Sequence, residues 1–127
     1  MKIRIQGNSL RLRLSQSEVA RFHETGQVTD GISFGAMPPV ALTYKLERSS
    51  LPEITAGFSD NCISVYVPEE QAATWAVSEQ EVGLEHLVRF DGSGHSLRVL
   101  IEKDFKCLAE RSGEDESDNF PNPNLIC

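Results

Sequence analysis

The sequence contains no apolar run long enough to cross a membrane and no surplus of positive charge. Its 127 residues include 12 Lys and Arg against 19 Asp and Glu, which gives a formal net charge of -7. A membrane-spanning helix needs about 20 consecutive apolar residues. An acidic chain is also a poor match for nucleic acid or for an anionic membrane. We therefore expect neither a nucleic acid nor a membrane as the partner.

Cysteine is scarce, and the close cysteine and histidine spacings typical of metal sites are missing. Cys62, Cys107 and Cys127 form an odd set without close spacing, whereas secreted disulfide scaffolds carry an even and denser set. The cysteines and histidines form no C-x-x-C or H-x-x-x-H pair, and no G-x-S-x-G motif surrounds Ser93 and His95. The first residues alternate as a strand does, without the features of a signal peptide. We expect a cytoplasmic protein that uses no cofactor.

The composition is that of a folded protein, with 39% hydrophobic and 24% charged residues. A chain of this length is expected to form one domain. Strand and helix patterns extend over residues 1–108, which we predict to be a single α+β domain. Residues 109–127 carry many acids and no periodicity, and we interpret them as an acidic C-terminal arm, loose or held to the body.

The N-terminal residues predict a β-hairpin about Gly7-Asn8 with one apolar and one basic face. If these two residues form the turn, Ile5 lies opposite Leu10. The same register places Arg4 opposite Arg11. Ser15 and Glu18 then have capping-box spacing, which predicts a helix start, and Gly26 predicts its end.

The same order of elements occurs twice, in pseudo-repeats over about 1–50 and 51–108. Ile5 and Phe58, Leu10 and Ile63, and Phe22 and Trp75 are all separated by 53 positions. Each half reads as strand, strand, helix, strand, strand. We predict a duplicated ββαββ unit that forms an eight-stranded, mainly antiparallel, curved sheet or barrel with two helices on its apolar side.

Positive charge is concentrated on one side of the predicted strands, although the chain is acidic. Like charges that face each other across a hairpin repel. One interpretation is a solvated outer face, neutralised by neighbouring acids or by the C-terminal arm. The other is a site for a phosphate-containing small molecule or an acidic peptide, because arginine presents forked donors to phosphate and carboxylate groups. The candidate anion-binding residues are Lys2, Arg4, Arg11, Arg13, Lys45, Arg98 and Lys106.

Two carboxylates and a lysine alternate in Glu102-Lys103-Asp104-Phe105-Lys106. Two β-rich repeats with such a strand and many cations resemble the CYTH or triphosphate-tunnel hydrolases. This resemblance implies that Glu102 and Asp104 hold Mg²⁺ or Mn²⁺ while the cations grip triphosphate. It departs from that family in placing the strand near the C-terminus, with Glu then Asp.

A second resemblance covers nearly the whole chain. The segments KIRIQGNSLRLRL, IEKDFKCL and EDESDNFPNP are similar to a small family of uncharacterised bacterial proteins. This resemblance implies no activity. From the residues we expect a non-catalytic module that binds an anion or an acidic peptide, with a metal-dependent phosphate hydrolase as the alternative.

Overall fold

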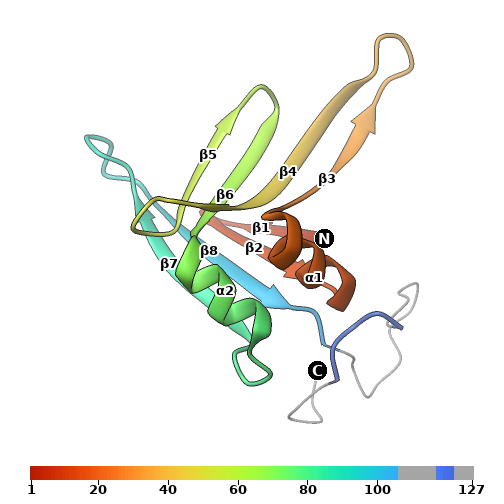
Figure 1. Cartoon of the computed structure of the whole chain (residues 1–127). Coiled ribbons are helices and arrows are strands. Elements are labelled where there is room, and N and C mark those ends of the chain that lie inside the picture. The colour runs from red at the N-terminus through yellow and green to blue at the C-terminus, as the bar shows by residue number, and fades with distance from the viewer. Residues whose placement is uncertain (106–116, 122–127) are drawn as a thin grey trace.

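A computed structural model describes residues 1–105 and 117–121 of the chain. Two helices and eight strands follow one another in the order ββαββ, ββαββ (Figure 1). None of the helices in the described residues is long and apolar enough to span a membrane. The elements are β1 (Lys2–Gln6), β2 (Ser9–Leu14), α1 (Gln16–Thr25), β3 (Gln27–Phe34), β4 (Val40–Ser49), β5 (Thr55–Ser59), β6 (Cys62–Pro68), α2 (Glu69–Val77), β7 (Gly83–Arg89) and β8 (Ser96–Lys103).

The strands form two four-stranded sheets and do not close into a barrel. Sheet A has the order β1-β2-β8-β7, and sheet B has the order β3-β4-β6-β5. Each sheet contains two antiparallel hairpins joined through a central parallel pair, β2 with β8 and β4 with β6. The prediction of an α+β fold with eight strands and two helices is confirmed, and the single curved sheet or barrel is wrong.

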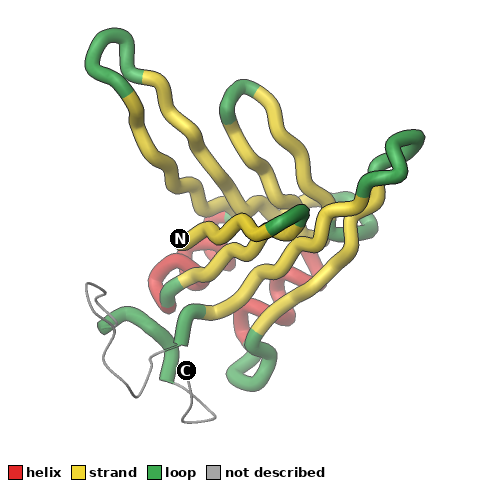
Figure 2. Tube along the Cα trace, turned by 180° about the vertical axis from the view of Figure 1, so that it is seen from behind, coloured by secondary structure: helices red, strands yellow, loops and turns green. Residues whose placement is uncertain are grey.

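The helices explain why one sheet does not form. Each helix carries the chain from a hairpin of one sheet to a hairpin of the other, so β1 and β2 lie in sheet A while β3 and β4 lie in sheet B. The helices contact each other and pack between the sheets at one end (Figure 1). Seen from behind, the hairpins of sheet B point away from the helices (Figure 2).

The first hairpin has the predicted register. Ile5 pairs with Leu10 and Arg4 with Arg11. Gly7 has a φ of 56°, a conformation that glycine adopts without the steric cost of a Cβ. Burial shows which side chains of β2 face the core, because Leu10, Leu12 and Leu14 are buried and the two arginines between them are not.

The predicted limits of the first helix are also confirmed. The Glu18 carboxylate accepts the backbone N–H of Ser15 at 3.0 Å, which completes the capping box. Gly26 ends the helix with a φ of 84°. A Cβ at this position would approach the Arg48 guanidinium to 2.9 Å, so both the conformation and the space favour glycine there.

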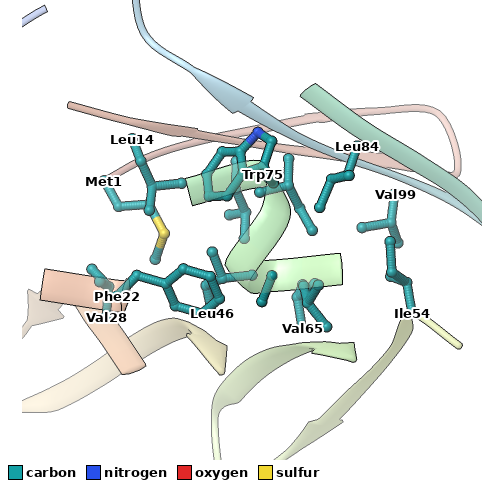
Figure 3. Close-up of a cluster of buried hydrophobic side chains, with 14 of the residues drawn as sticks. Met1, Leu14, Phe22, Val28, Leu46, Ile54, Val65, Trp75, Leu84 and Val99 are labelled. Carbon is teal, nitrogen blue, oxygen red and sulfur yellow. The ribbon is translucent and has the colours of Figure 1, made fainter. Parts of the chain in front are cut away.

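The core lies between the two sheets and the helices, as Figure 3 shows. Phe22 of α1 and Trp75 of α2 meet edge to face, with their ring centroids 6.1 Å apart. The indole N–H of Trp75 donates to the Val82 carbonyl at 3.3 Å, so the buried polar atom of this large side chain is satisfied. Leucine and valine side chains from both sheets belong to the same core, among them Leu46, Val65 and Val99.

The described part of the C-terminal arm contacts the body. The backbone N–H of Gln16 donates to the Asp118 carbonyl at 3.0 Å, and the N–H of Phe120 donates to the Asp104 carbonyl at 2.8 Å. The rings of Phe105 and Phe120 lie 5.6 Å apart. Ser117–Pro121 are therefore held against the start of α1 and the end of β8.

An ion cluster at Met1 ties the start of β1 to α1 and β3. The Met1 ammonium donates to the Glu18 carboxylate and, at 3.0 Å, to Asp30, while the Tyr44 hydroxyl donates to the Met1 carbonyl at 2.8 Å. Burial alone would lower the pKa of the ammonium, but its bonds to the two carboxylates raise it above the usual value of 8.0. Burial alone would raise the pKa of the Glu18 and Asp30 carboxyl groups, but their bonds to the ammonium lower it below the usual values.

These directions fix how the cluster affects stability. The amine contributes stability below its usual pKa of 8.0, and this is lost as the pH rises through the raised folded value. The carboxylates contribute above their usual values of 4.5 and 3.8, and this is lost as the pH falls through the lowered folded values. The full contribution is therefore present from about pH 5 to pH 8.

We expect Glu18→Gln to lower the free energy of unfolding by about 1.5 kcal/mol at pH 7, because the amide keeps the helix cap but loses the charge. The loss should shrink as the pH is raised to 10, where the wild-type ammonium itself loses its proton. Chemical denaturation at both pH values measures this, with the exposed Glu24→Gln in the same helix as the control. Equal losses at the two pH values would contradict a role for the ion pair.

Candidate functional site

The predicted cations of the first hairpin lie together on the outer face of sheet A, the face turned away from the core. Lys2 pairs with Arg13 and Arg4 with Arg11 across β1 and β2. Arg13 then lies beside Glu102 on the next strand. Arg98 lies on the same face, beside Ser9. We call Lys2, Arg4, Arg11, Arg13 and Arg98 the basic face.

Some of these cations form ion pairs with carboxylates. Arg11 Nε lies 2.9 Å from a Glu102 oxygen, yet that buried oxygen accepts no hydrogen bond. The N–H therefore does not point at it, and the contact is an ion pair only. Arg98 Nε bonds Glu85 at 2.6 Å, which lowers the pKa of this exposed carboxyl.

Arg4 and Arg13 have no carboxylate partner among the described residues. Arg4 donates to the side-chain oxygen of Gln6 at 3.1 Å, and no ion pair is formed by Arg13 within the same part of the chain. A shallow hollow of about 170 Å³ lies between them, lined by β1 and β2 side chains. Its walls are Lys2, Ile3, Arg4, Arg11 and Arg13.

The two remaining predicted cations are not placed with this group. Lys45 lies on β4 in sheet B, where it pairs with Glu47 at 3.5 Å and lies 5.8 Å from the centre of the Tyr66 ring. Lys106 lies outside the described residues. The structure therefore brings together five of the seven predicted cations.

The alternating carboxylates contact different cations of the basic face. β8 ends at Lys103, and Asp104 lies directly after it, where its backbone N–H donates to the Leu14 carbonyl at 2.8 Å. The Asp104 carboxylate lies 2.9 Å from Lys2 Nζ, whereas Glu102 contacts Arg11. No group of three or more metal-ligating side chains occurs within residues 1–105 and 117–121.

An apolar groove of about 430 Å³ opens between the ends of the two sheets and was not predicted from the sequence. Ile5, Phe58 and Phe90 contribute exposed side chains to it. The alternation of β1 and β5 predicted that Ile5 and Phe58 face inward. The alternation does not reveal that the two sheets diverge at this end. Because they diverge, the Ile5 and Phe58 side chains are exposed and line the groove.

Lys103 is a second feature that the sequence did not reveal. Its side chain is only 4% exposed, and its ammonium donates to the Ser78 carbonyl at the end of α2. The nitrogen also lies 5.7 Å from the centre of the Trp75 ring and 5.6 Å from that of Phe120. Burial lowers the pKa of Lys103, and Glu81 opposes this shift. The contacts are those of a cation that caps a helix C-terminus.

Comparison with known families adds to this description. A family described as "Family of unknown function (DUF7009)" matches residues 1–124. The chain belongs to this family. Searches of curated proteins and of solved structures gave no match. The predicted resemblance to an uncharacterised family is thereby confirmed, and the match gives no support to the triphosphate-tunnel resemblance.

For this DUF7009 protein we expect the basic face to lower the stability of the unliganded fold. Arg4→Thr removes a cation that faces Arg11, so it should raise the free energy of unfolding by up to about 0.5 kcal/mol at low salt. The gain should fall at 1 M salt, because the charges are then screened.

Urea denaturation at the two salt concentrations measures the effect. Arg89→Thr is the matched control, since Arg89 lies on the edge strand β7 opposite Ser96, which carries no charge. A loss of stability in Arg4→Thr at low salt would show that Arg4 stabilises the fold, against this prediction.

Proposed function

We propose that the protein is a binding module for an anionic ligand and that the basic face is its site. The observation that carries the proposal is the pairing of Arg4 with Arg11 and of Lys2 with Arg13 in a chain of net charge -7. Two like-charged pairs on adjacent strands repel, and an anion placed between them removes that repulsion.

The arrangement suits phosphate or carboxylate groups. Arginine offers several N–H donors in a planar fork that matches both groups. Arg4 and Arg13 are free of carboxylate partners among the described residues and border the hollow. A group bound there would contact both strands of the hairpin, so its affinity would depend on charge and on salt.

No specific observation favours the alternative of a metal-dependent phosphate hydrolase. It requires the carboxylates of Glu102 and Asp104 to share one metal ion, whereas each contacts a different cation. A tunnel fold also requires a closed barrel, and the sheets here are open. The binding experiment below includes metal so that this alternative is tested as well.

We expect tripolyphosphate, ATP or an acidic peptide to raise the melting temperature by several degrees at about a hundred times its dissociation constant. The shift should fall at high salt and in Arg4→Gln/Arg13→Gln. Arg89→Gln, which removes a cation elsewhere on sheet A, should leave it unchanged. Thermal melts with each ligand, with and without Mg²⁺ or Mn²⁺, provide the measurement.

Two outcomes would change the proposal. If no anion shifts the melting temperature, the basic face is a solvated surface and not a site. A shift that requires metal and disappears in Glu102→Gln would instead favour the hydrolase, and phosphate release would then be assayed.

We further propose that the two halves arose by duplication of a ββαββ unit. Exchanging the halves converts the order β1-β2-β8-β7 into β5-β6-β4-β3, which is sheet B. Arg48, at the end of β4, donates to the His23 carbonyl at 2.9 Å near the end of α1. Lys103, at the end of β8, likewise donates to the Ser78 carbonyl at the end of α2. Corresponding cations at both helix ends support a common origin.

The odd, widely spaced cysteines support a reducing compartment, so we retain the cytoplasm as the proposed location.

A further inference from the structure

Strand β1 crosses the inner face of sheet B along one row of side chains. Asp30, Tyr44, Ile63 and Phe58 are neighbours across the four strands of sheet B. Met1, just before β1, contacts Asp30 and Tyr44 at one end of this row. Ile5, near the end of β1, lines the apolar groove together with Ile63 and Phe58 at the other end.

The outer side of β1 is an open sheet edge. In sheet A, β1 pairs only with β2. Gln6 and Ser9 flank a two-residue turn, so their backbone N–H and C=O groups bond each other. Hydrogen-bonded and non-hydrogen-bonded pairs alternate along a hairpin, so the backbone N–H and C=O of Ile5 point away from β2. By the same alternation the backbone N–H and C=O of Ile3 also point away from β2. Among the described residues, neither Ile3 nor Ile5 makes a backbone bond beyond the hairpin.

An exposed apolar surface lies next to this edge. Beyond the row under β1, the inner face of sheet B continues with the pairs Ile32–Leu42 and Phe34–Val40. Ile32, Phe34 and Val40 are each more than half exposed. No charged residue occurs between positions 31 and 44. Figure 2 shows the hairpins of sheet B extending past β1. We call Ile32, Phe34, Val40 and Leu42 the apolar shelf.

The two faces of β1 thus present different chemistry to anything added at its edge. Lys2 and Arg4 lie on the outer face, and Ile3 and Ile5 lie on the inner face. The side chains of a strand alternate between the two faces of a sheet. An added strand would place every second side chain over the apolar shelf and the others beside the basic face.

We propose that the edge of β1 binds an extended peptide in which apolar and acidic residues alternate. The backbone of the peptide pairs with the outward groups of Ile3 and Ile5, as in other cases of strand addition. Its apolar side chains cover the shelf, and its carboxylates pair with Arg4 and its neighbours. This inference rests on the proposed function, since the basic face supplies the charge complementarity.

A second copy of the chain is a poor occupant of the same edge. Pairing β1 with β1 would bring Lys2 and Arg4 of one copy beside those of the other. Cations on an edge strand are a common device against such self-association. The same cations attract an acidic strand, so charge selects a different partner.

The length of β1 sets the size of the peptide. Its five residues match a peptide of about six residues, since neighbouring strands pair residue by residue. The probe is therefore a fluorescent hexapeptide in which Val and Glu alternate. Two peptides act as comparisons: three Val followed by three Glu, and alternating Val and Lys.

We expect the alternating Val-Glu peptide to bind at least tenfold more tightly than either comparison peptide, measured by fluorescence anisotropy at low salt. Ile5→Pro should weaken binding at least tenfold, because it removes an outward N–H that the β1–β2 ladder does not use. Ile5→Val, which keeps this N–H, should bind as the wild type does.

The shelf is tested separately with Ile32→Asp, which should also weaken binding at least tenfold. Ile32 is exposed, so the variant is expected to fold, and circular dichroism checks this. Val77→Asp places the same change on an exposed position of α2 and should have no effect.

The outcomes separate this inference from the proposed function. Equal binding of the alternating and block Val-Glu peptides would overturn strand addition. Binding that depends on Arg4 and Arg13 but not on Ile5→Pro or Ile32→Asp would overturn it too, while leaving an anion site. If tripolyphosphate and both Val-Glu peptides fail to bind, the inference and the proposed function both fail, and the cations serve only to protect the edge.

Discussion

The fold depends on the parallel pairing of a strand from each half at the centre of each sheet. β2 pairs with β8, and β4 pairs with β6. Without these two ladders the chain is a set of hairpins, and an isolated hairpin is marginally stable in water. The ladders bring leucines and valines from distant parts of the chain into one core around Phe22 and Trp75. Through these pairings each half contributes one hairpin to each sheet. The positions of the surface features follow from this exchange of hairpins.

The exchange also creates the features that we interpret as functional. Since the sheets are packed by the helices at one end, their inner faces are uncovered at the other, where Ile5 and Phe58 line the apolar groove. Contiguous exposed apolar surface of this kind is typical of interaction sites. The edge of β1 lies between this surface and the basic face, so one short strand presents apolar, polar backbone and cationic groups together.

Much of the local structure was predictable because it depends on neighbours in sequence. The turn at Gly7-Asn8 fixes which residues face each other, so the pairing of Arg4 with Arg11 followed from alternation alone. Ser15, Glu18 and Gly26 determine where α1 begins and ends. The last strand was predicted to extend through Asp104 to Lys106, whereas β8 ends at Lys103 and Lys106 lies outside the described residues. Alternation of residue types contains no signal for the end of the strand at Lys103.

The sequence by itself determined the eight strands, the two helices, the apolar and basic faces of β1 and β2, and the net negative charge. Only the tertiary structure decided that two sheets form instead of one, that Lys45 lies apart from the other cations, and that Lys103 is buried at the end of α2. The physical reason is that alternation fixes the face of a side chain within its own strand. The partner of that strand depends on contacts between residues that are far apart in the chain.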